Sequence, residues 1–172
     1  MAIPRATDFN SIVSFDLKSI GNKYILWMIC TFTKFIKATV VNNKNPGTII
    51  KALHRSWCMD IGYPTVGFWC DNGGEFLNAK MEEFVNKLGL KISFTPSYSP
   101  WSNGINERNH YSCDVIVKKI MEEDRKIVLQ EAVTMASWTH NTNINTLGYS
   151  PLQLMTGKSI VLAGLTSGNV AT

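Results

Sequence analysis

Three short runs of β-branched and aromatic residues, separated by breaks of only a few residues, occupy the first quarter of the chain. They cover residues 11–17 (SIVSFDL), 23–32 (KYILWMICTF) and 35–41 (FIKATVV). Such side chains suit the pleated surface of a sheet, and a break such as Gly21-Asn22 suits a tight turn. We therefore expect three antiparallel strands joined by hairpins, against which the rest of the chain must pack.

The rest of the chain alternates between helical periodicity and short apolar runs. Apolar residues three and four positions apart predict helices at residues 46–61, 81–88, 107–123, 127–140 and 151–155. Short apolar runs predict strands at residues 66–70 and 92–95. Two prolines and a glycine predict a loop that can move at residues 96–104. This order describes an α/β layer fold with a mixed five-stranded sheet flanked by helices.

Composition favours one compact domain in residues 1–158, followed by a flexible tail or truncated linker in 159–172. No apolar run reaches the roughly 20 residues of a membrane span, and we expect no membrane partner. The four cysteines show no disulfide-framework spacing and the first residues no secretory signal, so we expect an intracellular protein.

Positive charge is concentrated near the N-terminus. Residues 1–55 hold eight Lys or Arg against Asp8 and Asp16, whereas the whole chain carries only +4. This excess suits a polyanion such as DNA, although a solvated, mildly basic surface has the same composition.

Three carboxylates fall where a phosphoryl-transfer site would need them. Asp16 lies near the end of the first predicted strand, Asp71 at the end of the fourth, and Glu107 at the start of the helix after the predicted loop. Ligands of open α/β sheets gather near strand ends, and paired Mg²⁺ or Mn²⁺ ions need clustered oxygen ligands. A single Asp at a strand end is more often a turn residue. The separations, 54 residues and then 35, make the set more specific.

The local sequence resembles the catalytic core of retroviral and long-terminal-repeat retrotransposon (gypsy-like) integrases, whose pattern is Asp, Asp, then 35 residues, then Glu. Residues 69–76 (WCDNGGEF) are similar to the family's segment around its second Asp. Residues 95–108 (TPSYSPWSNGINER) are similar to its active-site loop and third acid, and residues 148–158 (GYSPLQLMTGK) to the end of its cores. The resemblance covers roughly residues 8–158.

This resemblance implies an RNase H-like fold and an Mg²⁺- or Mn²⁺-dependent DNA nucleotidyltransferase with endonuclease activity. Asp16 would touch both metal ions, Asp71 one and Glu107 the other. The implied reactions are trimming of a DNA 3′ end and strand transfer of that end into target DNA. The implied partners are element and target DNA and a second copy of the chain, as a homodimer or higher oligomer, with a nuclear location in the host cell.

Residues near the three acids are candidate DNA contacts by the same resemblance, namely Asn72, Ser99, Asn103, Asn106, Arg108 and Lys118. Asn103 and Asn106 could equally cap a helix, and for Ser102 capping is the preferred interpretation. Helical spacing puts Glu107, Tyr111, Asp114 and Lys118 on one face, which we expect to point towards the site. Integrases often place basic residues on this face, and Asp114 departs from that pattern.

Two rival functions stay open. One is a domesticated, non-catalytic module that binds DNA or protein, although such a module has no evident need for all three acids. The other is a nuclease of the same fold, which only an assay of strand transfer separates from an integrase. The cysteines and histidines lack zinc-site spacing, so we expect the zinc and DNA-binding modules that flank integrase cores to lie outside these residues. A predicted apolar stripe on the helix at 127–140 is a candidate pairing face, formed by Val128, Ala132, Met135 and Trp138.

Overall fold

The computed structural model describes residues 6–94, 100–145 and 148–158, with the backbone alone for 100–110. The strands are β1 (Ile12–Ile20), β2 (Lys23–Cys30), β3 (Ile36–Val41), β4 (Gly67–Cys70) and β5 (Lys91–Phe94). The helices are α1 (Pro46–Leu53), the π-helical turn η1 (His54–Cys58), α2 (Ala79–Lys87), α3 (Pro100–Glu123), α4 (Leu129–Thr142) and α5 (Pro151–Thr156). None of these described helices is both long and apolar enough to cross a bilayer. The predicted tail, residues 159–172, lies outside the description.

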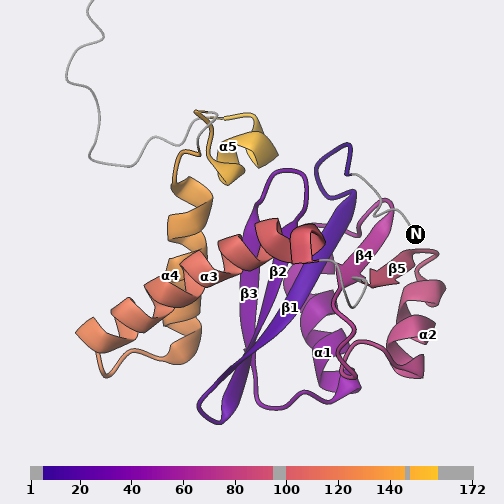
Figure 1. Cartoon of the computed structure of the whole chain (residues 1–172), viewed down its shortest axis with the longest axis horizontal. Coiled ribbons are helices and arrows are strands. Elements are labelled where there is room, and N and C mark those ends of the chain that lie inside the picture. The colour runs from indigo at the N-terminus through magenta and orange to yellow at the C-terminus, as the bar shows by residue number, and fades with distance from the viewer. Residues whose placement is uncertain (1–5, 95–99, 146–147, 159–172) are drawn as a thin grey trace, which may run out of the picture.

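The strands form one mixed sheet in the order β3-β2-β1-β4-β5 (Figure 1). The pairs β1–β2 and β2–β3 are antiparallel, as hairpins require, whereas β1–β4 and β4–β5 are parallel. Parallel neighbours need long crossover connections, and the helices between β3 and β4 and between β4 and β5 supply them. The predicted mixed five-stranded sheet is therefore confirmed.

The middle of the sheet is buried on both faces because helices cover each side (Figure 1). Successive side chains of a strand point to opposite faces. Leu26, Met28 and Cys30 of β2 therefore pack under α1 and α2. Trp27 and its two neighbours on the same side of the strand pack under α3 and α4.

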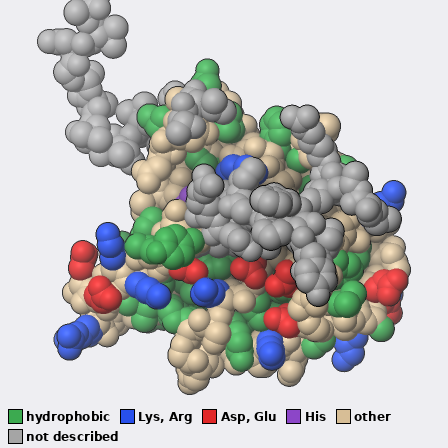
Figure 2. Space-filling view, viewed as in Figure 1, with side chains coloured by type: hydrophobic (Ala, Val, Ile, Leu, Met, Phe, Trp, Pro, Cys, Tyr) green, Lys and Arg blue, Asp and Glu red, His purple; other side chains and the backbone are tan. Residues whose placement is uncertain are grey.

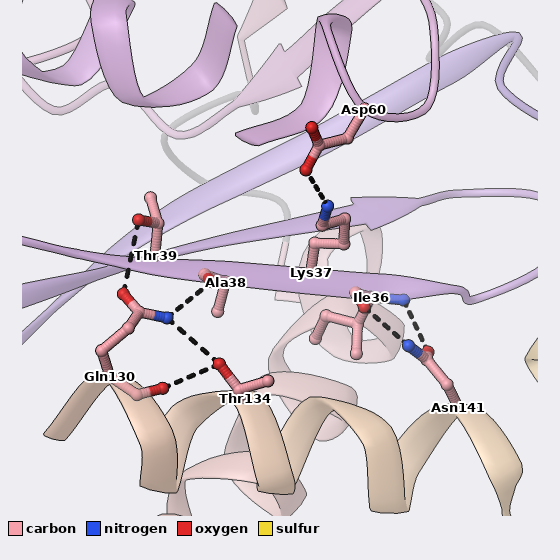
Figure 3. Close-up of polar contacts among 8 residues, drawn as sticks. All are labelled: Ile36, Lys37, Ala38, Thr39, Asp60, Gln130, Thr134 and Asn141. Atoms are coloured by element: carbon pink, nitrogen blue, oxygen red, sulfur yellow. Dashed lines mark hydrogen bonds and ion pairs between the residues drawn. The ribbon is translucent and has the colours of Figure 1, made fainter. Parts of the chain in front are cut away.

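Helix α4 also closes the outer edge of β3 through two side-chain amides (Figure 3). Asn141 accepts a hydrogen bond from the Ile36 N–H and donates one to the Ile36 carbonyl oxygen, both at 2.8 Å. Gln130 accepts from the Val40 N–H at 2.8 Å and donates to the Ala38 carbonyl oxygen at 3.5 Å. These backbone groups would otherwise form an open sheet edge, at which another chain could pair.

Helix α3 begins earlier than its sequence predicts. Its first residue is Pro100, so the prediction of a loop is wrong for residues 100–104, and Glu107 lies two turns inside the helix. Proline fits the first turn because the missing N–H has no helical partner there, and one glycine costs only about 1 kcal/mol. Ser102 and Asn103 are inside the helix and do not cap its start.

The predicted apolar stripe of α4 divides between two environments. Val128, at the N-cap of α4, is 59% exposed, and Met135 and Trp138 are 51% and 52% exposed. Ala132 is fully buried against the sheet, so its assignment to an outward face is wrong. Apolar residues occupy more of the circumference of α4 than the side that faces the core, so some of them are exposed to solvent.

Candidate active site

Asp16 lies on the side of the sheet that α3 covers. It pairs with Trp27 across the β1–β2 ladder, and directly opposed residues share a face. Trp27 packs under α3, whereas Phe15, the residue before Asp16, packs on the α1 side. The carboxylate is half-buried, and its Oδ1 accepts a hydrogen bond from the Leu17 N–H at 2.8 Å.

Asp71 reaches the same level of the sheet because β1 and β4 are parallel neighbours. The last pair of their register joins Ser14 to Trp69; Asp16 follows two residues later in β1, and Asp71 follows two residues later as the first residue after β4. Cys70, the last residue of β4, packs on the α1 side, and Asp71 begins the turn that follows. Strand β1 continues to Ile20, so Asp16 lies in the middle of its strand, and the prediction that it stands near a strand end is wrong. The two acids are still within electrostatic reach, because burial and then the charge of Asp16 raise the pKa of the Asp71 carboxyl.

The turn after β4 fixes the Asp71 carboxylate. The Gly73 N–H donates to Asp71 Oδ1 at 3.0 Å, in the manner of an Asx turn. A Cβ on Gly73 would lie 3.0 Å from that oxygen and 2.9 Å from Glu75 Cδ, so a side chain there would displace one or both carboxylates. The turn is anchored by Phe76, which is buried and lies 5.0 Å from the Phe15 ring, centroid to centroid.

Negative charge accumulates around Asp71. Partial burial raises the pKa of the Asp71 carboxyl above its ordinary value, and the charges of Asp16 and Glu75 raise it further, against the hydrogen bond from Gly73. Burial, followed by the charges of Asp71 and Asp16, also raises the pKa of the Cys70 thiol well above its usual range. Cys70 is buried in the core on the α1 side, so the oxygen donors define this site.

Glu75 is a member of this acidic group that the sequence predictions did not include. Its carboxylate lies beside Gly73, close to Asp71. The signal in the sequence was weak, because a glutamate four residues after an aspartate is common on any surface. Only the fold of the glycine turn brings the two side chains together.

Helix α3, which includes position 107, crosses this face of the sheet (Figure 1). The helix is tied to the strands seven residues further on, at Asp114. The Trp27 indole N–H donates to Asp114 Oδ1 at 3.1 Å, and Lys18 Nζ lies 3.8 Å from Asp114 Oδ2. Seven residues make nearly two helical turns, so positions 107 and 114 share a face. Figure 2 shows acidic side chains in a row across the face of the molecule on which α3 lies.

The candidate DNA contacts are scattered around this site. Asn72 is exposed beside Asp71. Asn103, Asn106 and Arg108 occupy the first turns of α3, where the structure describes the backbone only.

Two other DNA-contact predictions have different outcomes. Ser99 lies outside the described residues. Lys118 is exposed, as is Tyr111 at 70%, so both side chains are open to solvent and the contact of Lys118 with DNA stays a prediction. The buried face of α3 is instead centred on Cys113 and Val117.

The residues present fit a hard divalent cation. Asp16 in β1 and Asp71 directly after β4 supply the oxygen donors that Mg²⁺ and Mn²⁺ prefer. Burial, followed by the charges of Asp16 and Glu75, raises the pKa of the Asp71 carboxyl. Among residues with described side chains, no three His, Cys, Asp or Glu form a metal-binding group. The Glu107 side chain is outside that set, so its role as a metal ligand stays a prediction.

The chain is similar in sequence to polyproteins of retroelements. Residues 7–100, more than half of the chain, match the family model described as Integrase core domain. A Retrovirus-related Pol polyprotein from transposon 412 of Drosophila melanogaster is 27% identical over 81% of the chain. A Gag-Pro-Pol polyprotein of Simian retrovirus SRV-2 is 31% identical over 57% of it. The alignments cover 11% and 5% of these two polyproteins.

Solved integrases share the fold. A simian T-cell lymphotropic virus intasome in complex with PP2A regulatory subunit B56 gamma holds a chain with TM-score 0.81, 19% identity, and coverage of 99% of this chain and 62% of that one. The HTLV-2 integrase catalytic core domain in complex with magnesium gives a TM-score of 0.75 at 20% identity, covering 88% and 99%. The expected RNase H-like fold is confirmed by these likenesses. Together with the matched family model, they show that the chain belongs to the integrase core domain family.

Proposed function

We propose that the chain is a metal-dependent catalytic core that processes DNA 3′ ends and joins them to target DNA. The observation that carries the proposal is that Asp16 in β1 and Asp71, directly after the parallel neighbour β4, each lie two residues beyond the last pair of these strands, Ser14 and Trp69. Neighbouring strand backbones lie about 4.8 Å apart, so acids supplied by two adjacent strands can share a cation. A binding module has no need of such a pair.

Asp16, Asp71 and Glu107 would hold two Mg²⁺ or Mn²⁺ ions. Support comes from the magnesium complexes of the HTLV-2 core and from the crowding of carboxylates around Asp71. When bound, such ions activate the attacking oxygen and stabilise the leaving oxygen of a phosphodiester.

The chain itself contributes position. The β1–β4 pairing fixes Asp16 and Asp71, the Gly73 N–H orients the Asp71 carboxylate, and α3 brings position 107 over the sheet. Rigid placement of the reacting groups supplies much of the rate in reactions of this kind. Asn72, exposed beside Asp71, is the described polar side chain best placed to contact the DNA strand.

DNA and further copies of the chain are the proposed partners. The simian virus neighbour is an intasome, and the HTLV-2 core has dimeric and trimeric forms. By extension, this chain would act as a homodimer or higher oligomer on element and target DNA in the host nucleus.

The experiment that tests the proposal replaces each acid by its amide: Asp16→Asn, Asp71→Asn and Glu107→Gln. Loss of metal-ligand charge should lower strand transfer and cleavage by about 100-fold or more each, because the ions supply several kcal/mol to the transition state. Gel assays on a branched DNA substrate with Mn²⁺ measure both reactions. Glu82→Gln, on the exposed face of α2, is the matched control and should keep full activity.

Each rival function has its own outcome in this assay. Near wild-type activity in Glu107→Gln would contradict the proposed site. Cleavage without any joining by the unaltered chain would indicate a nuclease, and DNA binding with neither reaction would indicate a non-catalytic module.

A further inference from the structure

An ion pair joins β1 to α3 beside the proposed active site. Lys18 Nζ lies 3.8 Å from Asp114 Oδ2, and the two side chains are 59% and 14% exposed. The lysine therefore projects largely into solvent, whereas its partner is mostly covered. Lys18 is not among the DNA contacts that the sequence predicts. Asp114 occupies the helix face on which integrases often place basic residues.

Asp114 is held in place from below by Trp27. The Trp27 side chain is fully buried, and its indole N–H donates to Asp114 Oδ1 at 3.1 Å. A buried indole has one N–H and usually finds an acceptor, so this bond fixes the aspartate. Since Trp27 is also the ladder partner of Asp16, Asp114 belongs to the framework that positions the proposed site.

Lys18 lies on the same face of β1 as Asp16, two residues further along. Alternate residues of a strand are separated by roughly 6.8 Å, so the ammonium group is within side-chain reach of a strand bound at Asp16. A separation of 3.8 Å is an ion pair and is too long for a hydrogen bond, so this contact uses none of the three ammonium donors. Asp114 thus attracts the lysine without consuming its hydrogen-bonding capacity.

We propose that Lys18 binds a phosphate group of the DNA strand at the active site, and that Asp114 is the positioning residue that holds Lys18 there. The assignment rests on the proposed function. DNA approaching Asp16, Asp71 and Glu75 meets like charge, and a cation beside Asp16 offsets that repulsion where the strand must bind. The positive charge is thus carried by β1, while α3 carries its acidic partner.

The experiment measures binding of a fluorescent branched DNA by anisotropy, in Ca²⁺ and in EDTA, over a range of salt concentrations. Lys18→Gln should weaken binding about five- to tenfold near 0.1 M salt and make the slope of log K against log salt shallower by about 0.7 to 0.9, the share of one phosphate contact. Lys18→Arg should bind like the unaltered chain. Lys87→Gln is the matched control: Lys87 is exposed and ion-paired with Glu83 at 2.7 Å on α2, and its loss should change neither value.

Asp114→Asn separates positioning from general electrostatics, since it keeps an acceptor for Trp27 and removes only the charge. Removing a negative charge near DNA should tighten binding if Lys18 acts without positioning, whereas loss of its anchor should weaken binding two- to threefold. Unchanged DNA affinity and salt slope in Lys18→Gln, or tighter binding in Asp114→Asn, would overturn the respective assignment. An unaltered chain that binds DNA through Lys18 yet joins no strands would instead contradict the proposed function.

Discussion

At the scale of single residues, the Asp71 carboxylate depends on the backbone around it. Gly73 donates to Oδ1, and its missing side chain leaves room for both Asp71 and Glu75. Asp16 and Glu75 together raise the pKa of Asp71 beyond the effect of its partial burial. Metal binding and substitution at this turn should therefore respond to small changes in space and charge.

Gly73→Ala should weaken Mn²⁺ binding and lower strand transfer by roughly tenfold or more, as loss of an outer-shell contact typically does. The new Cβ would meet Asp71 Oδ1 at 3.0 Å and Glu75 at 2.9 Å, so the carboxylate must move. Titration calorimetry with Mn²⁺ measures the affinity. Gly74→Ala is the control, because a Cβ there meets nothing within 4 Å. Equal behaviour of the two variants would show that close packing at Gly73 does not orient Asp71.

Asp71→Asn should raise the melting temperature of the metal-free protein at neutral pH and abolish its stabilisation by Mn²⁺. A raised pKa means that the folded state binds the proton more tightly than the unfolded state, so ionisation of Asp71 lowers stability as pH rises through the folded pKa. The difference between the two proteins should close as pH falls towards the ordinary range of an aspartate. Without metal, the neighbouring carboxylates repel one another and lower the stability of the folded protein. Bound Mn²⁺ removes this repulsion, so the stability of the folded protein increases with Mn²⁺ concentration. Thermal melts at several pH values, with and without millimolar Mn²⁺, measure both effects, and a metal response retained by Asp71→Asn would contradict the assignment.

At the scale of elements, α4 does for β3 what another strand would do. Its amides occupy the outward N–H and C=O groups of Ile36 and the neighbouring edge positions (Figure 3). Gln130 and Asn141 are 11 residues apart, three helical turns, so both face the strand. The edge is thereby protected from pairing with other chains.

Asn141→Leu should lower the free energy of unfolding by about 2 to 4 kcal/mol. The leucine fills the space but leaves both backbone groups of the fully buried Ile36 without their amide partner, at about 1 to 3 kcal/mol for each unsatisfied group. Urea unfolding followed by circular dichroism measures the change. Asn143→Leu, at an exposed position after the same helix, is the control and should stay within about 0.5 kcal/mol. A small effect at Asn141 would show that water replaces the amide at this edge.

At the scale of the whole molecule, the outer side of α4 leaves large apolar side chains in solvent. Val128, Met135 and Trp138 are each more than half exposed, at spacings that put them on one side of the helix. Clustered exposed apolar groups are typical of interaction surfaces, and a closed pair uses the same patch twice.

Trp138→Lys should shift the chain from dimer to monomer without unfolding it, because a charge would be buried at the pairing surface. Size-exclusion chromatography with light scattering measures the mass at high concentration. Met59→Lys is the control, since Met59 is 68% exposed and follows η1 rather than belonging to α4. Reversal-type strand transfer on a branched substrate should persist in the monomer, which contains the whole metal site, whereas paired insertion of two DNA ends by these 172 residues alone should fail. A strict monomer before substitution would contradict the pairing face.

The sequence by itself determined the elements and the three candidate ligands. Side-chain alternation and turn preferences depend on residues close together in the sequence. Local sequence patterns therefore suffice to recognise the strands, the helices and the spacing of Asp16, Asp71 and Glu107. The start of α3 at Pro100 was missed because prolines and polar residues favour a loop unless tertiary contacts hold the helix.

Only the tertiary structure decided which residues meet. The parallel pairing of β1 with β4 sets Asp16 level with Asp71, and the glycine turn brings Glu75 to them. Trp27 and Asp114 are 87 residues apart in sequence, and Ile36 and Asn141 are 105 apart. Such bonds depend on the packing of whole helices against the sheet, because a hydrogen bond needs its two groups within about 3 Å and no local pattern specifies that distance.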